Sequence, residues 1–188
     1  MLWLAFGVLL WSGVHALRSA AGSLRARLIA SMGEDKYKAA FALAILASLA
    51  LMIVGWRAAT PVAVYQPPGW GRAAAVFLML LAFVLFAASA MATNIKRFIR
   101  HPQLTGVLLW AVAHLLSNGD GRSLVLFGVL GSWALVEMPL ISRREGPWRR
   151  PGAQPLQAEL KPLLGGVIGY LVFFVAHPYL FGVSPTPM

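Results

Sequence analysis

The sequence contains no cysteine and few charged residues. The absence of cysteine from all 188 residues excludes disulfides, iron–sulfur clusters, thiolate-ligated haem and a cysteine nucleophile. Any transition-metal or haem site must therefore use the four histidines, the few carboxylates or methionine. Charged residues make up 12% of the chain, whereas a soluble domain carries about 25%. A surface this poor in charge must be largely apolar, so lipid is the expected solvent.

The few charges are mostly basic, with 16 Lys and Arg against 6 Asp and Glu. On a soluble protein this excess would indicate a nucleic-acid partner. Here the basic residues lie in short tracts between apolar runs, where anionic lipid headgroups are the expected partners and nucleic acid is not. The first apolar run has no charge before Arg18. Because a signal peptide begins with basic residues, we interpret this run as a retained helix.

Six apolar runs are long enough, or nearly so, to cross a bilayer as helices. They cover residues 2–17, 39–56, 73–92, 102–117, 123–141 and 162–181. The first is short, but its pattern continues to Leu24. The turn-forming residues 118–122 predict that the fourth and fifth runs form an antiparallel hairpin. The sequence therefore predicts an all-α, polytopic membrane protein, in which residues 1–188 form one transmembrane domain of about six helices.

The loops between these runs alternate in charge. The first, third and fifth loops hold 13 basic residues, and the second and fourth hold 3. Since basic loops stay in the cytoplasm, we expect a bacterial inner-membrane protein whose two termini both face outward. The stretch 146–155, rich in proline and glycine, is expected to be an irregular cytoplasmic loop.

Ionisable residues inside membrane spans are costly and are candidates for function. His15 shares a helix face with Ser12, Ser19 and Gly22, small residues that would admit a partner helix or a flat cofactor. Two interpretations stay open for His15: a ligand, or a neutral histidine bonded to a neighbouring helix. The same two apply to His114, which lies furthest from bulk water.

The other two histidines stand beside prolines. His101 precedes Pro102, which suits a helix N-terminus, so His101 is expected to cap that helix unless an anion binds there. His177 precedes Pro178 and resembles a boundary signal near the end of the last span. His101 and His114 are 13 residues apart, or about 20 Å along a helix. They therefore cannot ligate the same iron.

Glu137 is the one carboxylate well inside an apolar run, about one turn from the expected cytoplasmic end. The favoured interpretation is that it extends toward Arg143 or Arg144, or balances another cation. We find no nucleotide-binding glycine loop, no serine–histidine–acid grouping and no pair of carboxylates in one span.

Several tracts resemble the NnrU family across essentially the whole chain. They are RHPQLTG at 100–106, LW at 109–110, AHLLSNGD at 113–120, HALR at 15–18, LRARLI at 24–29 and HPYLFGV at 177–183. The family is similar to the 15-cis-zeta-carotene isomerases, which use haem b. The resemblance implies that His15 and His114 bind the haem iron. The isomerases have a cysteine where this chain has Ala111, which puts ligand switching in doubt. Bacterial members are associated with the expression of nitrite and nitric oxide reductases.

The first hypothesis is thus a haem-binding protein, with a hydrophobic small molecule as a further partner. Two other functions stay open. The Arg-His-Pro tract also resembles membrane methyltransferases of the isoprenylcysteine carboxyl type, which implies that Arg100, His101 and Gly106 contact S-adenosylmethionine. The third hypothesis is a non-catalytic assembly or regulatory factor, with a homo-oligomer as a further expectation. The sequence leaves open whether the protein is an enzyme.

The expected topology bears on which histidines can pair. It places His15 near the cytoplasmic boundary and His114 in the outer half of its span, a difference in depth of roughly 15 Å. The two axial ligands of one haem lie about 4 Å apart across the iron. By depth, His114 pairs more naturally with His177.

Overall fold

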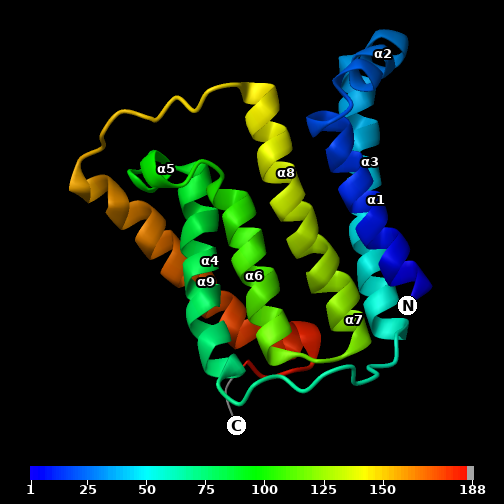
Figure 1. Cartoon of the computed structure of the whole chain (residues 1–188), viewed down its shortest axis with the longest axis vertical. Helices are drawn as coiled ribbons and strands as arrows, with labels where there is room; N and C mark the ends of the chain where they lie inside the picture. Colours follow the sequence, from blue (N-terminus) through cyan, green and yellow to red (C-terminus); the bar gives the residue numbers. More distant parts are fainter. Residues whose placement is uncertain (186–188) are drawn as a thin grey trace. The chain divides into compact units, whose positions relative to one another are not determined.

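A computed structural model describes residues 1–185 (Figure 1). Five helical segments are long and apolar enough to cross a membrane, and Pro102–Ser117 is a shorter apolar helix. Among the described residues, β-structure is limited to one isolated bridge between Ala63 and Asp120. These findings confirm the predicted all-α polytopic class. The chain forms two compact units, which interleave in sequence.

Unit 1 contains Met1–Val64 and Asp120–Pro147. Its elements are α1 (Leu2–Ser19), α2 (Gly22–Met32), α3 (Glu34–Ala58), α7 (Gly121–Ser123), the π-helical segment η1 (Leu124–Gly128) and α8 (Val129–Glu145). Glycines let α1 and α3 approach as antiparallel neighbours. A Cβ on Gly7 would lie 2.8 Å from the Met52 nitrogen, and a Cβ on Gly55 would collide with the backbone of Leu4.

Helix α8 runs parallel to α1. The Ser19 hydroxyl donates to the Glu137 carboxylate (2.9 Å), and Arg144 donates to the Arg18 carbonyl (2.8 Å). The C-terminal ends of α1 and α8, with Arg18 and Arg144, therefore lie at the same end of unit 1. At the other end, the guanidinium of Arg122 lies 4.4 Å from the Trp56 ring. Six alternating spans require that the first and fifth, α1 and α8, run in the same direction, and that the second, α3, runs in the opposite one. The helices of unit 1 have these directions.

Unit 2 contains Tyr65–Gly119 and the described residues from Trp148 onward. Its elements are α4 (Gly71–Ala90), α5 (Ile95–Phe98), α6 (Pro102–Ser117), the 3₁₀ turn η2 (Leu156–Glu159) and α9 (Leu160–Phe181). Helix α4 packs antiparallel to α6 and to α9. A Cβ on Gly106 would lie 2.7 Å from the Phe86 ring, and a Cβ on Gly166 would lie 2.6 Å from Val84 Cα. Small residues thus set the spacing here as well.

A polar network joins the end of α4 to the start of α9. The Asn94 backbone N–H donates to the Glu159 carboxylate (2.6 Å). The Asn94 amide also exchanges two 2.9 Å hydrogen bonds with the backbone of Gln154. Residues 146–155 form no regular secondary structure, as the sequence predicted, and this network fixes their C-terminal end.

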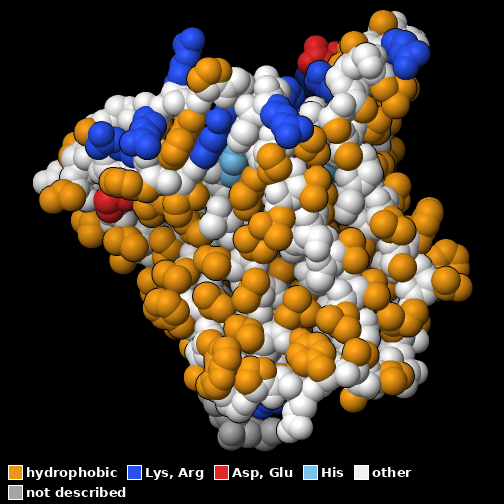
Figure 2. Space-filling model, in the orientation of Figure 1, with side chains coloured by type: hydrophobic (Ala, Val, Ile, Leu, Met, Phe, Trp, Pro, Cys, Tyr) orange, Lys and Arg blue, Asp and Glu red, His pale blue; other side chains and the backbone are white. Residues whose placement is uncertain are grey.

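The apolar flanks of the long helices face outward in both units. Figure 2 shows hydrophobic side chains over these flanks and Lys and Arg side chains toward helix ends. On α9 the exposed residues include Leu171, Val172 and Val175. In a soluble protein such a surface would cause association. It suits a lipid environment, and it agrees with the low content of charge.

Some boundaries differ from those predicted. Helix α1 does not continue to Leu24: it ends at Ser19, and the separate helix α2 begins at Gly22. Helix α3 begins at Glu34 rather than residue 39, because Gly33, with φ +85°, starts a new helix. The expected hairpin between the fourth and fifth spans stays a prediction, since α6 and α8 belong to different units.

Candidate functional site

Two of the four histidines meet in unit 2. The rings of His114, on α6, and His177, on α9, have centroids 6.5 Å apart with an angle of 26° between their planes. The Trp110 ring lies 5.2 Å from His114, and the Phe181 ring lies 4.8 Å from His177. This is the pair that the depth argument favoured.

Backbone carbonyls orient both imidazoles. His114 Nδ1 lies 2.8 Å from the Trp110 oxygen, and His177 Nδ1 lies 2.7 Å from the Val183 oxygen. Because a carbonyl oxygen only accepts, each Nδ1 must carry the proton. The lone pair of each neutral ring is then on Nε2. Histidines that bind metals usually have this arrangement, with one ring nitrogen fixed by a backbone or carboxylate oxygen.

The ring centroids of the two imidazoles are 6.5 Å apart, and imidazole is a ligand that iron accepts. In the described part of the chain, no group of three or more His, Cys, Asp or Glu side chains is arranged to hold a metal ion. Two imidazoles alone do not complete a tetrahedral zinc site, but they do complete a porphyrin-bound iron.

His15 lies in a separate aromatic cluster in unit 1. Its Nδ1 bonds to the Trp11 carbonyl (2.9 Å). Its ring centroid lies 4.5 Å from Trp11, 5.1 Å from Trp133 and 5.8 Å from Phe41. The indole nitrogens of Trp11 and Trp133 are buried and have no hydrogen-bond partner among the described residues. Two buried donors in one cluster indicate a place for a water molecule or for an oxygen atom of a ligand.

Glu137 lies one turn of α8 beyond Trp133 and is 5% exposed. Its carboxylate accepts a hydrogen bond from Ser19 on α1. The prediction that it extends toward Arg143 or Arg144 is not met, because Arg144 instead donates to the Arg18 carbonyl and to Glu145. Glu137 therefore bonds across two membrane-spanning helices.

His101 and Gly106 lie at positions that have a structural role in α6. His101 is the N-cap residue of α6 with Pro102 in the first turn, as predicted, although its side chain makes no capping hydrogen bond. Since α6 is continuous from Pro102 to Ser117, His101 and His114 lie at opposite ends of it. Gly106 faces Phe86 on α4. Its lack of a side chain thus serves packing between helices.

A tryptophan stands four residues before each of His15, His114 and Glu137. The sequence predictions did not use this spacing. Trp11 precedes His15 and Trp110 precedes His114 by four positions, and in each case the tryptophan carbonyl holds the histidine. Trp133 precedes Glu137 by the same interval. The structure joins His114 to His177, whereas His15 belongs to the other unit. The pairing of His15 with His114 stays a prediction.

Comparison with known proteins identifies the family of this chain. Searches of curated proteins and of solved structures return none. A protein-family model described as NnrU protein matches residues 3–185. The match covers the residues of both units, and with them all four histidines. The chain belongs to the NnrU family.

Proposed function

We propose that this NnrU-family membrane protein binds haem b, with His114 and His177 as the axial ligands. The observation that carries the proposal is the pair of imidazoles 6.5 Å apart, each with Nδ1 bonded to a carbonyl oxygen. The chain's own groups would fix both rings: the Trp110 carbonyl orients His114, and the Val183 carbonyl orients His177. Haem would supply one-electron chemistry at this site.

Absorption spectroscopy with histidine variants tests the proposal. Protein purified in detergent from haem-replete cells should show a Soret band, which His114→Ala and His177→Ala should abolish. His101→Ala is the matched control, because His101 lies at the opposite end of α6, and it should keep the band. A colourless, iron-free wild-type protein would contradict haem binding.

His15→Ala distinguishes this pair from the one that the family resemblance implies. If His114 and His177 are the ligands, the His15 variant keeps its Soret band. Loss of the band in His15→Ala, together with its retention in His177→Ala, would instead favour His15 and His114. In that case haem binding holds, and only the assignment of the second ligand changes.

The resemblance to bacterial NnrU proteins supports a role in the expression of nitrite and nitric oxide reductases. The similar carotene isomerases support redox isomerase-like chemistry as the alternative, and a non-catalytic assembly factor is the third. Complementation of a deletion strain separates a haem-dependent role from haem-independent assembly. If the role depends on haem, His114→Ala should fail to restore reductase activity to the deletion strain. If the protein is an assembly factor that needs no haem, the same variant should restore that activity.

We also propose that the protein lies in the bacterial inner membrane, with its basic loops in the cytoplasm. The distribution of 13 and 3 basic residues between alternating loops supports this orientation. So do the helix directions in unit 1, which bring Arg18 at the end of α1 and Arg144 at the end of α8 together.

A further inference from the structure

Unit 1 contains an apolar cavity beside the aromatic cluster of His15, with which it shares Phe41. It is open on one side and has a volume of about 140 Å³ between the end of α1, one face of α2 and the first turns of α3. Among its lining residues are Leu17, Leu28, Met32 and Ala44, and Tyr37 is the one lining side chain with a polar atom. By the same measure of volume, a dry cavity of about 150 Å³ binds benzene. This cavity therefore has room for a short length of hydrocarbon.

The breaks on either side of α2 create the cavity. Helix α1 ends at Ser19, and Gly33, with φ +85°, turns the chain from α2 into α3. Leu24, Leu28 and Met32 recur every four residues and share one face of α2. Leu28 and Met32 line the cavity. Leu24 is 39% exposed and Met32 is 36% exposed, so the chain itself only partly covers this face.

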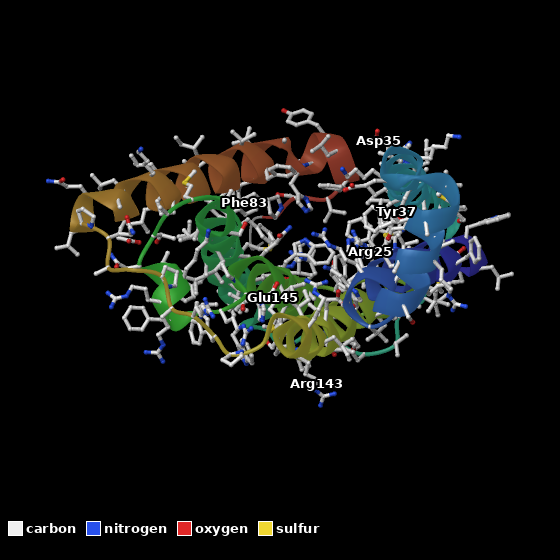
Figure 3. The ribbon with its side chains drawn as sticks, turned by 90° about the horizontal axis from the view of Figure 1, so that it is seen from above. Arg25, Asp35, Tyr37, Phe83, Arg143 and Glu145 are labelled. Carbon is white, nitrogen blue, oxygen red and sulfur yellow. The ribbon has the colours of Figure 1, made fainter. Side chains whose placement is uncertain are left out.

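The rim of the cavity is positively charged. The guanidinium of Arg25 on α2 lies 5.5 Å from the ring centroid of Tyr37, which is 9% exposed and lines the cavity. Figure 3 shows Arg25 and Tyr37 side by side. The segment from α1 to α3 carries the cations Arg18, Arg25, Arg27, Lys36 and Lys38 and the carboxylates Glu34 and Asp35. Lys38 and Glu34 form an ion pair of 2.9 Å, so a net positive charge remains.

We propose that this cavity binds one acyl chain of an anionic phospholipid, whose phosphate lies against Arg25. The lining residues Tyr37 and Ala44 are seven positions apart on α3, a depth of about 10 Å, which accepts part of one chain. Basic residues on an amphipathic helix at the membrane surface attract anionic headgroups. The cavity thus supplies the apolar contact, and α2 supplies the charge. The inference does not depend on haem binding.

Native mass spectrometry of the full chain in detergent tests this site. The protein is titrated with phosphatidylglycerol and, separately, with phosphatidylcholine carrying the same acyl chains. Wild-type protein should bind phosphatidylglycerol more tightly. Arg25→Ala should weaken phosphatidylglycerol binding about fivefold, the effect of one basic residue near a charged headgroup. It should weaken phosphatidylcholine binding less, because the choline of that headgroup offsets the charge of the phosphate.

Two variants separate this cavity from general surface electrostatics. Arg150 also lies over an aromatic ring, 5.0 Å from that of Trp148 in unit 2, so Arg150→Ala is the matched control and should change neither affinity. Ala44→Leu fills the cavity and should weaken the binding of both lipids. Leu28→Phe, which fills it from α2, replaces Ala44→Leu if that variant loses its helical circular-dichroism signal.

Three results would overturn the proposal. The first is equal affinity of wild-type protein for the two lipids, and the second is an equal loss on Arg25→Ala and Arg150→Ala. The third is full displacement of phosphatidylglycerol by millimolar inorganic phosphate, which would indicate a site for the free anion. Retention of lipid alongside phosphate is the expected result.

Discussion

At the scale of single residues, backbone carbonyls decide how the histidines can act. His15, His114 and His177 each bond through Nδ1 to a main-chain oxygen. In two of the three, the acceptor is the carbonyl of a tryptophan four residues earlier on the same helix. This local bond holds each of these two rings against its own helix, with the lone pair on Nε2.

The bond between Ser19 and Glu137 should contribute to the stability of unit 1. Ser19→Ala removes the donor to a buried carboxylate, so we expect the free energy of unfolding to fall by about 1 kcal/mol, within the range of hydrogen bonds between membrane helices. Ser48→Ala is the control. Ser48 is fully buried, but its hydroxyl bonds to the Ile45 carbonyl of its own helix, and we expect a change near zero. Unfolding of detergent-solubilised protein monitored by circular dichroism measures both, and equal losses would contradict an interhelical role.

The sequence was sufficient to identify the polar residues but only partly to pair them. Depth in the membrane favours His114 with His177, because both lie near the outer ends of spans that run in the same direction. Depth does not predict the bond from Ser19 to Glu137, which depends on the rotation of α1 and α8 about their axes. Hydropathy contains no information on that rotation, and Arg143 and Arg144 offered a closer partner in sequence.

At the scale of elements, glycines determine where helices make close contact. A Cβ on Gly55 would collide with the Leu4 backbone, whereas a Cβ on Gly13 would meet no atom within 4 Å. Both glycines are inside helices. The difference in their surroundings is therefore one of packing between helices rather than of backbone conformation.

Alanine at these two positions should have opposite effects. We expect Gly55→Ala to destabilise unit 1 by about 1–3 kcal/mol, the usual cost of overpacking. Gly13→Ala should stabilise it by about 0.5–1 kcal/mol, because alanine favours a helix interior. Thermal unfolding of the two purified variants in the same detergent measures the difference. A higher melting temperature for Gly55→Ala would show that α1 and α3 are not in close contact.

The element boundaries follow from the sequence except where short segments break the hydrophobic pattern. The fourth span was predicted with the bounds that α6 has, because Pro102 and Asn118-Gly119 mark its ends. Helix α2 was missed, since its residues continue the pattern of α1 through Leu24. The π-helical segment η1 was also missed. One additional residue in a helical turn leaves hydropathy unchanged, and only the backbone reveals it.

At the scale of the whole molecule, the order of the chain interleaves the two units. In the sequence, residues of unit 1 flank the first part of unit 2. The chain then returns from unit 1 to unit 2 through residues 146–155. The family match extends over both units. The sequence predicted a single domain, and that remains a prediction.

The absence of cysteine makes the orientation of the chain directly measurable. Gly69 and Gly152 lie in loops, and a Cβ at either position meets no atom within 4 Å, so each accepts a single cysteine without strain from neighbours. We expect a membrane-impermeant maleimide to label Gly69→Cys in intact spheroplasts and Gly152→Cys only in inverted vesicles, since basic loops remain in the cytoplasm. The opposite pattern would reverse the orientation, and labelling of both from one side would contradict the alternation of spans.

The reduction potential of the haem tests the central claim that His177 is a ligand. Because a methionine ligand raises the potential relative to a second histidine, we predict that His177→Met shifts it upward by on the order of 0.1 V, well inside the roughly 0.8 V range that axial ligands cover. His101→Met, at the far end of α6, should leave it unchanged. Potentiometric titration of the purified protein measures both. A haem whose potential is the same in wild-type protein and His177→Met would contradict the assignment of His177 to the iron.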